Sequence, residues 1–547
     1  MKKAGRMREH VLLLNLTRLG DMLQSQPLIQ DLHDSGHKVS LVCLENFAPA
    51  LALMRHVEHA CVLPGARLLA DTRSNWRSAA ARLLVLARDI REKTRADRVV
   101  NLTPTLPARL LAKLLAPSPA AILGFGMDEE GFGVNGGAWA SFLSGASGRR
   151  VNTPFNVADM FRRMGSAVCS PEIARRAGVS SLKKPSGAAF AAAEDLLRQI
   201  EKKADDTAAR PQGYVGFQLG ASEARRQWPV EYFADLGDRL WKAAGLCPVI
   251  LGTEAERNLA GAYGARAASP FVNAVGRTDI PELAALLSRM RLLVTNDTGT
   301  MHLAAGLGVP SLAFFLATAQ PWDTGPCLTG CCCLEPALSC HPCAYGGNRR
   351  CGQACLTRIS PRAAESMILG YLRGGSWSEP GPAVREQARV WLTAVDEHGF
   401  AALRCLSGHD AEDRGRWLAQ QRLVWRQILD DMDGRNEPDP GPGVNNLLPP
   451  LSPAFRGEVV SVLARAVRML ALLTEQGKLA GQSVMAGQLF LRNCDRLQQI
   501  LDACRPLASL GHFWRELVRD RGGNMEETLR LTSLLAGHLA RWETAQK

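Results

Sequence analysis

Residues that could bind an anion gather where short apolar runs end. The run Leu292–Thr295 leads into Asp297-Thr298-Gly299-Thr300-Met301-His302, which is followed by a helical pattern. The free N–H groups and the dipole of a helix start attract a pyrophosphate, and a glycine there allows close approach. His302, one turn in, could donate to a phosphate or a ribose. The alternative is an Asp/Thr helix cap with a core histidine.

A second stretch of this kind is Gly220–Pro229, after the apolar run Tyr214–Leu219. Its Gly-Ala-Ser turn offers backbone N–H groups and the Ser222 hydroxyl, and Arg225 and Arg226 follow. Together these groups could hold phosphate oxygens through charge-assisted hydrogen bonds. The alternative interpretation is a solvated basic loop.

Two carboxylates complete the set of candidate residues. Asp21 stands in Leu19-Gly20-Asp21, where the run Val11–Leu16 turns into a helix, and Glu256 follows Pro248–Leu251. For Glu256, a carboxylate at the end of a Rossmann strand often meets ribose hydroxyls. The alternative for both is a helix-start acid, the commonest role of Asp at that place.

The fifteen cysteines include a cluster at Cys340, Cys343, Cys351 and Cys355, with Cys327 and Cys331–Cys333 upstream. The C-x2-C and C-x3-C spacing suits four thiolates around one structural Zn or Fe ion. Reduced thiols or a structural disulfide are the alternatives. A closed four-thiolate site leaves no open position, so no catalytic role is expected.

These residues need a scaffold that brings strand ends together. The chain contains two successive series in which strand-like runs alternate with helical ones. This pattern predicts two α/β domains with parallel sheets, with ligands at the carboxyl ends of the strands. The first series has runs at Val11–Leu16, Val39–Leu44, Cys61–Pro64, Val99–Leu102 and Ala121–Gly124, with helices at Asp21–Asp34 and Ala79–Lys93. The second has runs at Tyr214–Leu219, Pro248–Gly252, Phe271–Val275, Leu292–Thr295 and Ser311–Leu316.

The domain boundaries follow from composition. Residues 1–203 form a first Rossmann-like domain, ending in helices at Phe155–Met164 and Gly187–Lys203. Residues 204–373 form a second, with a polar linker at 204–211 and a Cys-rich loop at 327–355. After a Gly/Pro break at 374–382, residues 381–547 read as helical throughout, interrupted by a Pro-rich insert at 432–453, and predict an all-α bundle. The five tryptophans after Pro380 fit a packed core.

Charge and hydropathy restrict the setting. The net charge is +12, of which residues 381–547, with 21 Lys and Arg against 20 Asp and Glu, carry only +1. The excess in residues 1–380 suits an anionic ligand or surface, or simply a basic soluble protein. Neither a secretion signal nor a membrane-spanning run is recognisable, so a cytoplasmic protein with at most peripheral membrane contact is expected.

The joint pattern resembles glycosyltransferase family 9, the bacterial heptosyltransferases. Leu19-Gly20-Asp21 with Pro27, the Gly220–Pro229 run and Asp297–His302 are similar to family motifs in order and spacing over residues 10–373. The resemblance implies a GT-B fold, two Rossmann-like domains facing a cleft, here with the helical bundle added. It also implies inverting transfer of heptose from ADP-heptose to an inner-core lipopolysaccharide sugar, without a catalytic cofactor.

The same resemblance assigns roles residue by residue. Asp21 is the expected general base. Ser222, Arg226, Glu256, Asp297, Thr298, Gly299 and His302 are the expected donor contacts, with Arg226 where relatives carry a lysine, a change that keeps the charge but alters the geometry. A protein heptosyltransferase and a non-catalytic scaffold are the alternatives. An NAD-dependent oxidoreductase is disfavoured, because no G-x-G-x-x-G motif follows the first apolar run. No nucleic-acid partner is expected. The sequence does not indicate the oligomeric state.

Overall fold

A computed structural model describes residues 8–147, 153–174, 181–199, 210–343, 352–435, 449–480, 482–521 and 524–546. The chain divides into two compact units. Unit 1 comprises residues 1–103, 114–117 and 156–408, and unit 2 comprises 104–113, 118–155 and 409–547. The predicted linker at 204–211 lies almost wholly outside the described residues.

The first sheet of unit 1 contains four parallel strands in the order β3-β2-β1-β4. These are β1 (His10–Leu14), β2 (Lys38–Leu44), β3 (Ala60–Leu63) and β4 (Arg98–Asn101). The connecting helices are α1 (Leu19–Leu23), α2 (Gln26–Asp34), α3 (Gly65–Ser74) and α4 (Trp76–Thr94), with a 3-10 helix at Glu45–Ala52. Helices α7 (Val157–Gly165), α8 (Pro171–Ala174) and α9 (Gly187–Leu197) also belong to unit 1.

The single helix predicted over Asp21–Asp34 is two helices. Pro27 stands in the first turn of α2 and has no N–H to continue a helix from Leu23. The Ser25 hydroxyl donates instead to the Met22 carbonyl at 2.6 Å. The short α1 is thereby set apart from α2 directly after strand β1.

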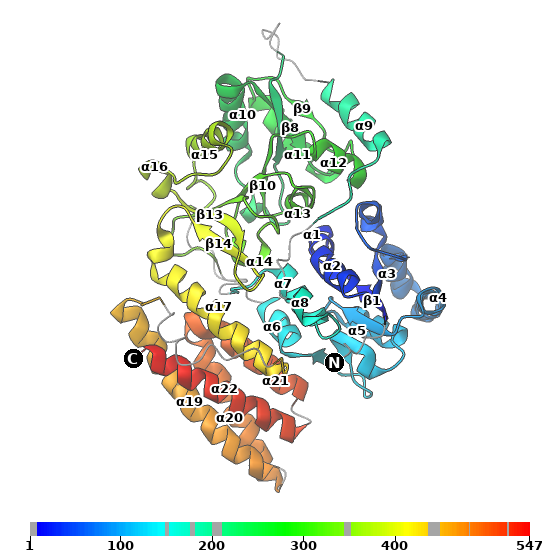
Figure 1. Ribbon diagram of the computed structural model, residues 1–547, viewed down its shortest axis with the longest axis vertical. Coiled ribbons are helices and arrows are strands. Elements are labelled where there is room, and N and C mark those ends of the chain that lie inside the picture. The colour runs from blue at the N-terminus through cyan, green and yellow to red at the C-terminus, as the bar shows by residue number, and fades with distance from the viewer. Residues whose placement is uncertain are drawn as a thin grey trace, which may run out of the picture. The chain divides into compact units, whose positions relative to one another are not determined.

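The second sheet has eight strands in the order β14-β13-β12-β11-β10-β7-β8-β9. Its parallel part comprises β7 (Gly213–Gln218), β8 (Leu246–Leu251), β9 (Val272–Asn273), β10 (Leu292–Asn296), β11 (Ser311–Phe314) and β12 (Cys332–Pro336). The helices are α10 (Val230–Ala244), α11 (Arg257–Arg266), α12 (Ile280–Leu287), α13 (Gly299–Gly306), α14 (Pro321–Thr324) and α15 (Pro361–Gly374). Figure 1 shows this α/β layering in green, with α10 and α15 near each other. Two Rossmann-like sheets in one chain define the GT-B fold.

The prediction that the chain is helical throughout after residue 381 is wrong at its start. A short helix, α16 (Pro382–Arg385), is followed by β13 (Ala388–Val395) and β14 (Ala401–Cys405), which extend the second sheet as an antiparallel pair. The segment Ala388–Val395 is a short, mostly buried run that contains β-branched and aromatic side chains such as Val390 and Trp391, a strand signal that the composition change at residue 380 obscured. The helical part therefore begins at residue 409.

Unit 2 combines the helical tail with a segment of the first half of the chain. The tail helices, yellow to red in Figure 1, are α17 (Asp413–Met432), α19 (Pro453–Ala480), α20 (Val484–Asp502), α21 (Ala508–Arg521) and α22 (Met525–Gln546). Helix α5 (Leu106–Leu115), strands β5 (Ile122–Met127) and β6 (Gly133–Gly136) and helix α6 (Ala138–Ser147) come from the first half. Each of the five tryptophans after Pro380 is at most 3% exposed, which confirms that they pack inside.

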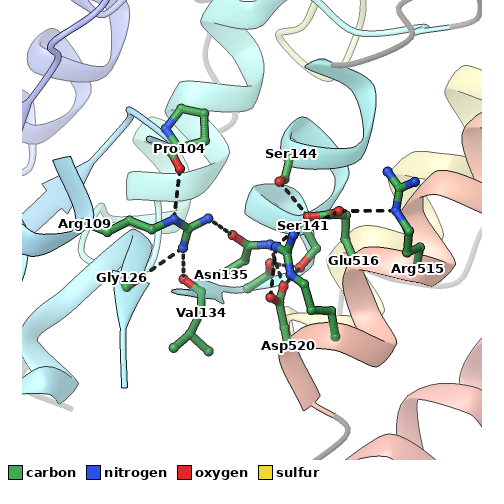
Figure 2. A network of polar contacts seen from close by, with 12 residues as sticks. Pro104, Arg109, Gly126, Val134, Asn135, Ser141, Ser144, Arg515, Glu516 and Asp520 are labelled. Carbon is green, nitrogen blue, oxygen red and sulfur yellow. Dashed lines mark hydrogen bonds and ion pairs between the residues drawn. The ribbon is translucent and has the colours of Figure 1, made fainter. Parts of the chain in front are cut away.

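A polar network joins α21 to the early segment (Figure 2). The buried guanidinium of Arg109 donates to the carbonyls of Pro104, Gly126 and Val134 and to the Asn135 side chain at 2.7 Å. Asn135 in turn donates to Asp520, and Ser144 donates to Glu516 at 2.7 Å. The helical bundle is therefore hydrogen-bonded to residues 104–155.

Within the part of the chain that the structure describes, none of the helices has the length and apolar character needed to span a membrane.

Candidate functional site

Two glycines bring the predicted Gly-Asp turn and the predicted donor helix together. A Cβ added at Gly20 would lie 2.9 Å from Cδ2 of His302 and 3.4 Å from Cα of Gly299, and one added at Gly299 would lie 3.4 Å from the Gly20 nitrogen. Helices α1 and α13 therefore meet through bare backbone. Asp21 directly follows Gly20 in α1 and is partly exposed.

Two buried asparagines, which the sequence interpretation missed, shape the loops that follow the central strands. Asn15, directly after β1, donates to the Asp21 carbonyl at 3.0 Å and accepts from Thr17. Asn296, the last residue of β10, accepts from the Trp228 backbone and donates to the Leu219 carbonyl at 2.8 Å. An asparagine ending an apolar run was the available signal, because a buried amide must find partners.

Arg226 is a buried residue at the centre of the second-domain loops. Its Nε donates to the Thr318 hydroxyl at 2.8 Å, and one of its terminal nitrogens lies 3.5 Å from a carboxylate oxygen of Asp297. The side chain is only 6% exposed. Two residues predicted to bind the donor are thus an ion pair, while the neighbouring Ser222 is exposed on its loop.

Glu256 occupies the helix-start position that was the alternative to a ribose contact. Its carboxylate accepts from the Thr253 backbone N–H at 2.7 Å and from the Gln218 amide at 2.9 Å. Gln218 also accepts from the Thr300 hydroxyl at 2.9 Å, so hydrogen bonds connect Glu256 to the start of α13. The residue is partly exposed, and its role toward a ribose stays a prediction.

His302 is a buried residue in the first turn of α13. Burial lowers the pKa of its imidazole to about 4, so the ring is neutral at pH 7. Its Nδ1 is buried and has no hydrogen-bond partner within the described residues. Thr298 caps the helix in an extended conformation, and its hydroxyl lies 3.3 Å from that of Thr295. A neutral imidazole can donate or accept toward a ligand that reaches the Gly20–Gly299 contact.

The cysteine loop is only partly described, because Cys351 lies outside the described residues. Cys340 is exposed, Cys343 partly exposed and Cys355 buried. His341, between the first two, is directed to a buried carboxylate: its Nδ1 lies 3.5 Å from Glu335, which also accepts from Trp391. No group of three potential metal ligands gathers among the described residues. A structural metal therefore stays a prediction from the spacing alone.

Comparisons with known proteins find similarity over the part of the chain that contains many of these residues. Residues 183–349 match the family model of glycosyltransferase family 9 (heptosyltransferase). Lipopolysaccharide heptosyltransferase 1 of Pseudomonas aeruginosa is 28% identical over 190 residues, 31% of this chain and 51% of the relative. Lipooligosaccharide heptosyltransferase 2 of Haemophilus influenzae is 27% identical over 135 residues, 23% of this chain and 38% of the relative.

The chain thus spans about half the length of the first curated relative and less of the second. A solved E. coli ADP-heptose lipopolysaccharide heptosyltransferase II is similar over 68% of this chain and 99% of its own, with 17% identity and a TM-score of 0.48. The two Rossmann-like sheets give this chain the GT-B fold. The part that matches the family model, residues 183–349, carries the Arg226–Asp297 pair and His302.

Proposed function

We propose that this protein is an inverting heptosyltransferase. It uses ADP-heptose as the donor and an inner-core lipopolysaccharide sugar as the acceptor. The contact of Gly20 with Gly299 and His302 carries the proposal, because the proposed base Asp21 directly follows Gly20 in α1. The family 9 match over residues 183–349 supports the class of donor and reaction. No metal or other cofactor has a part in the proposed chemistry.

In the proposed reaction, Asp21 accepts the proton of an acceptor hydroxyl while that oxygen attacks the anomeric carbon of the heptose. The bond from that carbon to the phosphate oxygen breaks, and ADP leaves with the electron pair. Attack opposite the leaving group inverts the anomeric configuration. The partial exposure of Asp21 is compatible with an acceptor reaching its carboxylate from solvent.

The leaving diphosphate needs positive charge and N–H donors. The start of α13 offers free N–H groups at Gly299 and Thr300, and Arg226 lies beside it, 3.5 Å from Asp297. Ser222 is proposed as a further phosphate contact, and Glu256 as the ribose contact. Asp297 shares the charge of Arg226 until the diphosphate develops its own.

The acceptor is the less constrained part of the proposal. An acceptor on lipopolysaccharide places the reaction at the inner face of the inner membrane, with the protein cytoplasmic and peripheral. The alternative acceptor is a protein hydroxyl, and the assay below separates the two.

The test is a transfer assay with ADP-heptose and, in separate reactions, Kdo-lipid and bacterial proteins. We expect Asp21→Asn to lower kcat by 10² to 10⁴ (about 3–5 kcal/mol of barrier) without lowering the melting temperature. Asp34→Asn, at the end of α2, is the matched control and retains activity. Transfer only to protein would replace the lipopolysaccharide acceptor, and undiminished transfer by Asp21→Asn would remove Asp21 as the base.

A further inference from the structure

Helices α3 and α4 leave large apolar side chains in solvent. Leu69 is 61% exposed, Trp76 60%, Leu84 55% and Val85 49%. None of the α3 side chains is buried, and α4 buries only Ala79, Ala87, Ile90 and Thr94 over nineteen residues. Single exposed apolar side chains are ordinary, but four on one helix pair mark a surface that binds something.

The same helices are strongly basic. Residues 65–95 contain eight Lys and Arg against three Asp and Glu, a net charge of +5. One of the three acids, Asp71, already pairs with Arg82 at 2.9 Å and ties α3 to α4. The guanidinium of Arg77 lies over the Trp76 ring, 4.7 Å from its centroid. Exposed tryptophan and leucine among arginines are typical of helices that lie at a bilayer interface.

A groove lies at the far end of α4. It has a volume of about 610 Å³ and is lined by Leu84, Arg88, Arg91 and Glu92 of α4, by Arg95 directly after α4, and by Leu115 and Pro117. Within it, Arg88 lies 3.8 Å from the Glu92 carboxylate. Leu84, Arg88 and Arg91 recur every three or four positions and so share one face of α4, and Arg95 is the residue that ends the helix. Neither Arg91 nor Arg95 forms an ion pair within the described part of the chain. The groove thus combines apolar walls with guanidinium groups able to bind an anion.

The groove is separate from the candidate site. Arg95 precedes strand β4 and so lies at the amino edge of the first sheet, whereas Asp21 follows strand β1 at the carboxyl edge. Helix α4 spans the distance between the edges, roughly 28 Å at 1.5 Å per residue. A ligand of the groove is therefore not the sugar acceptor held at Asp21.

We infer that the α3–α4 surface docks this protein on an anionic lipid bilayer. Leu69, Trp76, Leu84 and Val85 enter the headgroup region, and Arg88, Arg91 and Arg95 hold a lipid phosphate in the groove. Charge decides against a second copy of the chain as the occupant, because two surfaces of net charge +5 repel each other. The inference concerns a surface outside the transfer site and does not depend on the sugar donor.

The test is co-sedimentation of the full chain, without nucleotide sugar, with vesicles of phosphatidylglycerol and phosphatidylcholine or of phosphatidylcholine alone. We expect binding only to the anionic vesicles and a strong decrease at high salt. The triple variant Arg88→Gln, Arg91→Gln, Arg95→Gln should weaken binding on the order of 100-fold, at about 1 kcal/mol per arginine. Leu84→Gln with Val85→Gln should weaken it roughly 10-fold.

The matched control is Val484→Gln with Met485→Gln on α20, which changes two side chains that are 80% and 77% exposed. This control should bind as the wild type does. Equal binding to both kinds of vesicle, absence of wild-type binding, or loss of binding in the α20 control instead would overturn the inference. A change of molecular mass in solution for the α4 variants, with vesicle binding intact, would make the surface a self-association site and would also overturn it.

Discussion

Gly220 and Glu256 approach so closely that a Cβ on the glycine would lie 1.6 Å from Oε1 of the carboxylate. We expect Gly220→Ala to displace Glu256 from Gln218 and Thr253, to raise the KM for the nucleotide sugar at least several-fold and to cost about 1–3 kcal/mol of stability. The measurements are donor kinetics and urea unfolding.

Gly261 provides the matched control for that substitution. It lies within α11, and a Cβ there meets nothing within 4 Å. Gly261→Ala should keep the KM and stabilise the protein by about 0.5–1 kcal/mol, since alanine is the better helix former. If both variants behave alike, the close contact of Gly220 with Glu256 has no functional weight.

The buried pair of Arg226 and Asp297 should be energetically coupled. Removing one partner leaves the other charge buried, so Asp297→Ala is expected to cost about 3–5 kcal/mol in the free energy of unfolding. Arg226→Lys keeps the charge but loses the planar geometry, and it should raise the donor KM. A double-mutant cycle should give a coupling of about 0.5–3 kcal/mol. Arg225→Lys, which changes the ion pair of Arg225 with the more exposed Glu223, is the control. A coupling near zero between Arg226 and Asp297 would contradict the proposed pair.

Buried His302 predicts a loss of stability in acid. The unfolded chain binds a proton on this residue as the pH falls through about 6.5, whereas the folded protein resists it until about 4. The free energy of unfolding should therefore decrease as the pH falls through this window, by about 2 kcal/mol between pH 7 and pH 5. His302→Gln should lack this contribution in urea unfolding at the two pH values. His398→Gln, at a half-exposed position, should keep it, and an unchanged slope in His302→Gln would disprove the assignment.

The Arg109 network should decide the stability of unit 2 (Figure 2). Burial lowers the pKa of Arg109, and the side chain relies on three carbonyls and Asn135 for its hydrogen bonds. Arg109→Met leaves these acceptors unpaired and is expected to cost about 2–4 kcal/mol, with faster proteolysis of the tail. Arg73→Met, exposed on α3, is the control and should have no effect.

The cysteine spacing predicts one tightly bound Zn or Fe ion per chain. Elemental analysis of the purified protein should find about one equivalent, and Cys343→Ser should lose it. Cys504→Ser, a buried thiol on the tail, is the control. A wild-type protein free of metal would exclude the ion and leave reduced thiols or a disulfide.

The sequence predicted the parallel strands well, because runs such as Val39–Leu44 and Leu292–Thr295 are buried on both sides and bounded by turns. It missed the buried strand β12 at Cys332–Pro336, because a run of cysteines suggests metal ligands rather than a strand. It also missed β6 and α21. Their assignment depends on partners far along the chain, such as Asn135 and Asp520, and such contacts leave no local pattern.

The candidate site was predicted in part for a related reason. Helix-start residues such as Asp297 and Gly299 can be recognised by residue type and position, and the structure places Gly299 against Gly20. The pairing of Arg226 with Asp297 and the anchoring by Asn296 are tertiary contacts. Residue types alone could not distinguish a free phosphate-binding arginine from one already held by a carboxylate.

The hydrogen bond between Asn135 and Asp520 joins residues 385 positions apart. A ribosome must therefore add 385 residues after Asn135 before this residue can meet Asp520. During that interval Phe142 and Phe155, which are buried in unit 2 against each other, lack Trp425 and Phe513. During synthesis the nascent chain therefore exposes these aromatic side chains until the tail has been made. We expect chaperones to bind the chain in this period.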